Sequence, residues 1–216
     1  MSHFNKEKMD SDIEYNVIFL GNVGTGKSSI IQRRVNGDFS EIHNQTVGFD
    51  FKKITETVVD KQVRLNLVDT AGQETYRSVA SNYYHKADIC LFVADVTNRD
   101  SFRDLADWKS NLENVNNDAQ HILVINKIDM MPELSSNVEE NNDRNDSSQL
   151  VVEKNDFINE IKSIIRDFPN RFWVSAKSGE GINDVFNRAA FLALNGQPIN
   201  SSTQITENID GKKNCC

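Results

Sequence analysis

The sequence predicts an α/β fold in which helices cover both faces of a mostly parallel sheet. In the second half of the chain, a short apolar run is followed three times by a longer amphipathic one, as in repeated strand–helix units. The first half holds one such unit and two alternating segments joined by a turn, which adds an antiparallel strand. The length of 216 residues suits one domain with tails.

The first half is expected to contain three strands and one helix. Glu14–Leu20 is largely apolar and runs into a glycine, so we expect a buried strand there. Lys27–Asn36 spaces its apolar residues as an amphipathic helix does. Asp50–Val59 and Val63–Val68 alternate apolar and polar residues on either side of a polar turn, which predicts a hairpin.

The second half is expected to contain three strand–helix pairs. The strands are Ile89–Ala94, Ile122–Ile125 and Phe172–Val174. The helices that follow them are Ser101–Val115, Val151–Phe168 and Ile182–Leu194. Ser101 suits an N-cap, Pro169 ends the second helix and Gly196 lies just past the third.

Three polar segments are expected to lie outside the packed domain, which spans residues 14–196. Residues 1–13 form an extension, residues 131–149 an insertion between a strand and a helix, and residues 197–216 a tail. The insertion is rich in Asn, Ser and acidic residues, with too few apolar groups to offset the entropy of ordering. A solvated spacer is the plain interpretation of this segment, and a docking arm is the alternative.

Composition excludes several classes of protein. The longest apolar runs have six residues, whereas a membrane span needs roughly 20. The N-terminal segment lacks the apolar core of a secretory signal. A net charge of −8 argues against a nucleic-acid partner. The three cysteines, Cys90 and the final two residues, make a disulfide framework implausible, so we expect a reducing compartment.

A phosphate-binding motif follows the first predicted strand. Gly21–Ser28 reads G-N-V-G-T-G-K-S, the pattern G-x-x-x-x-G-K-[ST], and it opens a predicted helix. Its glycines let backbone N–H groups surround phosphate oxygens, Lys27 can reach the β- and γ-phosphates, and the Ser28 hydroxyl can bind Mg²⁺. The residues expected to hold phosphate are Gly24, Thr25, Gly26, Lys27, Ser28 and Ser29.

Three further motifs follow later strands. Asp69 ends the third strand, where it can hold Mg²⁺, while Gly72 can donate its N–H to a terminal phosphate and Gln73 can orient a water. Asn126-Lys127-Ile128-Asp129 offers a carboxylate that can accept the N1–H and 2-amino hydrogens of guanine. Ser175, Ala176 and Lys177 follow the last strand, where a backbone N–H can meet guanine O6. Each motif alone also suits a plain turn.

Together the four motifs resemble those of the small GTPases in order, spacing and strand context, over about residues 14–195. The resemblance implies a Ras-like P-loop fold with six strands, one of them an antiparallel edge strand, and about five helices. It also implies that Thr46 binds Mg²⁺ and senses the γ-phosphate, and that Phe39 stacks near the guanine. Gln73, Lys27 and Thr46 would then carry slow GTP hydrolysis, with Mg²⁺ held by Ser28, Thr46 and Asp69.

Within that superfamily the chain is most similar to the Rab branch. Thr46–Phe51 and Tyr83–Ala87 resemble Rab motifs, and the final residues Cys215 and Cys216 resemble a double prenylation site. The resemblance implies effectors, an exchange factor, a GTPase-activating protein and a GDP-dissociation inhibitor as partners, with a monomer as the default. It also implies the cytoplasmic face of an intracellular membrane, in exchange with the cytosol. Unmodified thiols are the alternative for the cysteines.

Two substitutions depart from the family pattern. Val23 stands in the phosphate loop where Ras-like proteins carry glycine, and its side chain can crowd Gln73, which predicts slow hydrolysis. Val68 replaces the usual Rab tryptophan, which with Phe51 and Tyr83 would form the aromatic effector surface. For both positions the alternative is a substitution without effect on function. The rival functions are a scaffold that retains GTP without hydrolysing it, and a P-loop ATPase or kinase, which Asn126 and Asp129 disfavour.

Overall fold

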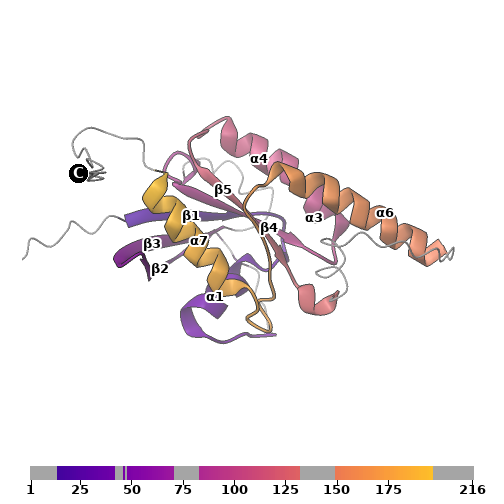
Figure 1. Cartoon of the computed structure of the whole chain (residues 1–216), viewed down its shortest axis with the longest axis horizontal. Coiled ribbons are helices and arrows are strands. Elements are labelled where there is room, and N and C mark those ends of the chain that lie inside the picture. The colour runs from indigo at the N-terminus through magenta and orange to yellow at the C-terminus, as the bar shows by residue number, and fades with distance from the viewer. Residues whose placement is uncertain (1–13, 42–45, 47, 71–82, 132–148, 197–216) are drawn as a thin grey trace, which may run out of the picture.

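Six strands form one sheet in the computed structural model, which describes residues 14–41, 46, 48–70, 83–131 and 149–196. The strands are β1 (Glu14–Leu20), β2 (Phe49–Val58), β3 (Lys61–Thr70), β4 (Ile89–Asp95), β5 (Gln120–Asn126) and β6 (Arg171–Trp173). Their order across the sheet is β2-β3-β1-β4-β5-β6 (Figure 1). The edge strand β2 is antiparallel to β3, and the other neighbours are parallel, as predicted.

Helices cover both faces of this sheet. They are α1 (Lys27–Asn36), α3 (Arg99–Arg103), α4 (Leu105–Glu113), α6 (Gln149–Ile164) and α7 (Ile182–Asn195). Single 3-10 turns follow β5 at Ile128–Met130 and α6 at Ile165–Asp167. Helices α1 and α7 pack together on one face, and α3, α4 and α6 lie on the other (Figure 1). This is the two-faced arrangement that the strand–helix alternation predicts.

Two apolar cores lie on either side of the sheet because side chains alternate along each strand. On β1, Val17 and Phe19 belong to the core beneath α1 and α7, whereas Ile18 and Leu20 belong to the core beneath α3, α4 and α6. The central strand β4 is buried at every position. Burial on both faces explains why its sequence is a continuous apolar run rather than an alternating one.

The predicted helix Ser101–Val115 begins earlier and is divided in two. Helix α3 begins at Arg99 and is capped by Asn98, whose Oδ1 accepts from the N–H groups of Asp100 at 3.0 Å and Ser101 at 3.4 Å. The predicted cap Ser101 is fully buried inside the helix. Its hydroxyl oxygen accepts from the Asp95 N–H at 2.9 Å, which ties the helix to the end of β4.

Other boundaries differ by a few residues. Strand β6 lies one residue earlier than predicted, and α6 passes into a 3-10 turn before Pro169. At the ends of the predicted insertion, Met131 is half-buried against the core and Gln149 begins α6. Residues 132–148, like the predicted extension 1–13 and tail 197–216, lie outside the described residues. Among the helices described, none is long and apolar enough to cross a membrane.

The Asn98 cap yields a stability prediction. Asn98→Ala removes the acceptor of two helix N–H groups, so we expect the free energy of unfolding to fall by about 1 kcal/mol. Urea denaturation followed by circular dichroism measures this loss. Asn114→Ala, an exposed substitution at the C-terminal end of α4, is the matched control and should change stability by less than about 0.5 kcal/mol. Equal losses in the two variants would refute the assignment of the cap.

Candidate functional site

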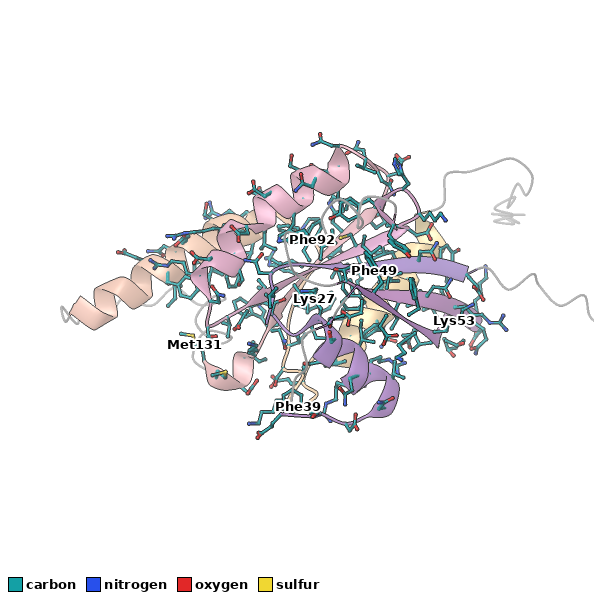
Figure 2. The ribbon with its side chains drawn as sticks, turned by 180° about the vertical axis from the view of Figure 1, so that it is seen from behind. Lys27, Phe39, Phe49, Lys53, Phe92 and Met131 are labelled. Carbon is teal, nitrogen blue, oxygen red and sulfur yellow. The ribbon has the colours of Figure 1, made fainter. Side chains whose placement is uncertain are left out.

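A cavity of about 680 Å³ lies at the carboxyl edge of the parallel sheet, among the loops that follow β1, β5 and β6. Strand ends meet at this edge because the strands are parallel. The cavity is lined by Val23, Gly24, Gly26, Lys27, Ser28, Ser29, Phe39, Glu41, Thr46, Thr70, Asn126, Lys127, Asp129, Met130, Ala176 and Lys177. Figure 2 shows Lys27 near the centre of the molecule and Phe39 on the loop beyond α1.

The loop after β1 buries a lysine beside the start of a helix. Lys27 is 5% exposed, and its Nζ donates to the carbonyl oxygens of Gly21 and Asn22, each at 2.8 Å. Burial lowers the pKa of Lys27 to about 8, although the charge of Asp69 acts in the opposite direction. Gly26 precedes α1 and has no side chain to cap it, so first-turn N–H groups face an incoming anion.

A buried carboxamide ties three loops together. Asn126, at the end of β5, donates from Nδ2 to the Thr25 carbonyl at 2.9 Å, and its Oδ1 accepts from the Ala176 N–H at 3.0 Å. Gly26 has a φ of 95°, and a Cβ at this position would collide with Asn126 Nδ2. Glycine is therefore required here both by the backbone conformation and by the approach of Asn126.

Two charged side chains follow Asn126 on the same loop. Asp129 Oδ1 accepts from the buried Ser175 hydroxyl at 2.6 Å, which joins the loop after β5 to the loop after β6. Lys127 has a φ of 67° and pairs through Nζ with Asp95 Oδ2 at 2.6 Å, at the end of β4. Both Asp129 and Lys127 line the cavity, so a carboxylate and an alkyl-ammonium chain are available to a ligand.

Three oxygen-bearing side chains suit a hard divalent cation. Ser28 Oγ and Thr46 Oγ1 are 2.8 Å apart, and Thr46 Oγ1 donates to Asp69 Oδ2 at 3.5 Å. Asp69 Oδ1 is buried and has no hydrogen-bond partner among the described residues. Burial raises the pKa of the Asp69 carboxyl, while hydrogen bonds and the Lys27 charge oppose this. Two hydroxyls and an unsatisfied carboxylate fit Mg²⁺, which completes its shell with water and phosphate.

Most of the predicted nucleotide-binding residues line the cavity, with a few exceptions. Thr25 and Ser175 are buried behind it, where they hold Asn126 and Asp129 in place. Gly72 and Gln73 fall within residues 71–82, outside the described residues. The predicted lipidation sites Cys215 and Cys216 also lie outside them. Their roles stay predictions.

Sequence reasoning missed Arg33 on α1. Its guanidinium donates from Nε to the Ala176 carbonyl at 2.8 Å, from Nη1 to the Gly37 carbonyl at 2.8 Å, and from Nη2 to the Lys177 carbonyl. Arg33 thus joins the loop after β6 to the end of α1, while Lys177 pairs with Glu41 at 3.1 Å. An arginine on the polar side of a helix carries no sequence signal for such a contact.

Among the residues predicted to meet effectors, Phe51 and Tyr83 are accompanied by a third aromatic residue that sequence reasoning did not include. Phe51 is 53% exposed and lies opposite Val68 in the β2–β3 pair, whereas Val68 is only 4% exposed. The Phe51 and Tyr83 rings have centroids 5.7 Å apart. Phe49, two residues from Phe51 on β2 and labelled in Figure 2, has its ring centroid closer to that of Tyr83. The Phe49 and Tyr83 centroids are 4.5 Å apart. The aromatic cluster is therefore Phe49, Phe51 and Tyr83, beside a hollow of about 200 Å³.

Comparison with known proteins identifies relatives of this chain. A sequence model described as "Ras family" matches residues 16–194. The Ypt/Rab-type GTPase YPT7 of Saccharomyces cerevisiae is 33% identical over 93% of this chain and 94% of its own. Human Ras-related protein Rab-3A is 37% identical over 59% of this chain and 60% of its own. Human Ras-related protein Rab-12 is 38% identical over 55% of this chain, a match that spans about half (49%) of its own length.

The Asn126 contact predicts different costs for alanine at two glycines of the same loop. Gly24 and Gly26 both have positive φ, but only Gly26 faces a neighbour, since a Cβ at Gly24 meets nothing within 4 Å. We expect Gly24→Ala to lower the free energy of unfolding by about 1–2 kcal/mol, and Gly26→Ala by about 2 kcal/mol more. Urea denaturation without nucleotide tests this, and equal costs would rule out a clash with Asn126.

Proposed function

The chain belongs to the Ras family, in its Rab branch, and from this premise we propose that it binds GTP and GDP with Mg²⁺ and hydrolyses GTP slowly. One observation carries this proposal: a single cavity is lined by the buried Lys27, by Ser28 and Thr46, and by Asn126 and Asp129. The Thr46 hydroxyl lies beside Ser28 and donates to Asp69, which stands just behind the lining. Lys27 suits a triphosphate, the Ser28 and Thr46 hydroxyls suit a cation, and Asp129 suits a purine. The proposed role is a switch in vesicle traffic, membrane-bound with GTP and extractable with GDP.

The base end of the cavity favours guanine over adenine. A carboxylate such as Asp129 accepts hydrogen bonds only, and guanine presents two donors, N1–H and the 2-amino group, on one edge. Adenine has an unprotonated N1 and no 2-amino group, so Asp129 would face a lone pair. The bond from Ser175 Oγ to Asp129 Oδ1 fixes the orientation of this carboxylate.

The phosphate end supports hydrolysis by positioning and charge. Lys27 is held between two carbonyl oxygens, from which it can bond the β- and γ-phosphates as negative charge develops. Thr46 brings its hydroxyl beside Ser28, and we assign to Gln73 the orientation of the attacking water. Mg²⁺, where bound by Ser28, Thr46 and Asp69, supplies further neutralisation of the phosphate oxygens.

The proposed membrane anchor is a pair of prenyl groups on Cys215 and Cys216. One lipid chain gives only marginal, reversible membrane binding, so two chains suit a protein that must stay on a membrane until it is extracted. Effectors would meet the exposed aromatic side of β2. An exchange factor, a GTPase-activating protein and a GDP-dissociation inhibitor complete the set of partners, and the location is the cytoplasmic face of an intracellular membrane.

A second function, a scaffold that retains GTP, is favoured by Val23. Its side chain is 45% exposed and lines the cavity within the phosphate loop. A branched side chain there takes up space that an attacking water, Gln73 or a partner's arginine would need. Thr46 and Gln73 retain the residue types that hydrolysis requires, so we rank the scaffold second.

A single-turnover assay distinguishes the two functions. Full-length protein is loaded with GTP labelled on the γ-phosphate, and phosphate release is followed in the presence of excess ATP. We expect slow release that ATP does not affect and that Gln73→Leu abolishes. Intact GTP over the same period, with release restored by Val23→Gly, would instead establish the scaffold. Displacement of GTP by ATP would contradict both.

Base selectivity gives a second test. We expect Asp129→Ala to weaken GDP binding by about 10²–10⁴-fold, because two charge-assisted hydrogen bonds are lost. Binding of ADP should change little, so the preference for guanine collapses. Competition against a fluorescent GDP analogue measures both affinities. Glu180→Ala, an exposed acidic substitution outside the cavity, is the control. A preserved preference for GDP in Asp129→Ala would remove Asp129 from base recognition.

A further inference from the structure

Asn22, the second residue of the phosphate loop, is held by two side chains from distant parts of the chain. Its Oδ1 accepts from Trp108 Nε1 at 2.9 Å, and its Nδ2 donates to Asp104 Oδ2 at 2.6 Å. A carboxamide can accept from the indole and donate to the carboxylate at once, whereas an aspartate at the same position could only accept. The bond to Asp104 is charge-assisted and therefore among the stronger kinds.

The groups that hold Asn22 are themselves fixed. Trp108, on α4, is 3% exposed and packs in the same apolar core as Phe102 and Leu105. Asp104 lies between α3 and α4, where its N–H bonds to the Asp100 carbonyl at 3.0 Å. The contact thus connects the phosphate loop to a packed helical segment more than 80 residues away in the sequence.

The backbone of Asn22 is where this contact meets the cavity. Its carbonyl oxygen accepts from Lys27 Nζ at 2.8 Å and from Thr25 Oγ1 at 2.9 Å. Any displacement of Asn22 therefore moves one of the two carbonyls that hold the Lys27 ammonium. Because Lys27 lines the cavity, such a displacement changes where its charge lies relative to the phosphates.

We propose that Asn22 is a positioning residue, held in place by its hydrogen bonds to Asp104 and Trp108. It fixes the carbonyl oxygen that accepts from Lys27 Nζ, and in this way it sets the rate at which nucleotide is released. This inference rests on the proposed nucleotide binding. It assigns to Asp104, which is not among the residues that line the cavity, a control over nucleotide release. A role confined to packing would affect unfolding without selectively affecting release.

Reversal of the Asn22–Asp104 pair tests the proposal. Asn22→Asp places two carboxylates 2.6 Å apart and removes the donor, and we expect a fluorescent GDP analogue to dissociate about 10–100-fold faster. Adding Asp104→Asn restores a donor–acceptor pair with the roles exchanged, and should return the rate to within about 3-fold of the original. Adding Asp107→Asn, an exposed α4 substitution with the same change in charge, should not rescue.

Dissociation is measured on the full-length chain, beside the thermal unfolding midpoint of each GDP-bound variant. Trp108→Phe, which removes only the indole donor, is a second probe and should release GDP several-fold faster. Release at the original rate in both Asn22→Asp and Trp108→Phe would overturn the proposal, as would equal rescue by Asp107→Asn. Failure of the unaltered chain to retain GDP would instead overturn the proposed function, and this inference with it.

Discussion

The Asn126 carboxamide is the interaction on which the site depends, because from the end of β5 it bonds both to the loop after β1 and to the loop after β6. Strands β1, β5 and β6 end at the same edge, and the Ser175–Asp129 bond also ties the loops after β5 and β6. Asn126 satisfies the Thr25 carbonyl and the Ala176 N–H together, and both groups are buried. An unsatisfied buried polar group costs about 1–3 kcal/mol, so loss of Asn126 would release the loop expected to hold phosphate from the loop expected to hold the base.

Burial of Lys27 places a second constraint on the same loop. A cation taken out of water needs acceptors, and the carbonyls of Gly21 and Asn22 provide them without a full negative charge. Burial lowers the pKa of Lys27 to about 8, and the two carbonyl partners of its ammonium carry no net charge. A phosphate arriving at the cavity supplies the missing charge. In the part of the chain that the structure describes, the Lys27 ammonium bonds to no carboxylate. The loop therefore places a buried cation where an anionic ligand would balance its charge.

The parts of this structure that could be predicted are those with a local signal. The bounds of β1 and α1 match the prediction residue for residue, because apolar periodicity and the glycine loop mark both ends. The cavity lining also follows from motifs at strand ends. Asn98, Arg33 and Asp104 could not be found in this way. Their roles depend on partners that are distant in sequence or on a choice between neighbouring cap residues, and neither leaves a periodic pattern.

The aromatic cluster on β2 shows which side chains surround Val68, one of the two departures from the family pattern. Taken alone, Val68 predicts that the aromatic surface is lost, since the resemblance to the Rab branch implies a tryptophan at this position. Phe51 pairs with Val68 across the two strands, and Phe49 lies two residues along on the same side of β2. The Phe49 ring reaches Tyr83 at 4.5 Å, closer than Phe51 does. Phe49 and Phe51 thus both supply aromatic area next to Tyr83, while a hollow lies beside Val68 and Phe51 is exposed. A partner that recognises this surface by its shape would meet the exposed Phe51 ring and the hollow beside Val68.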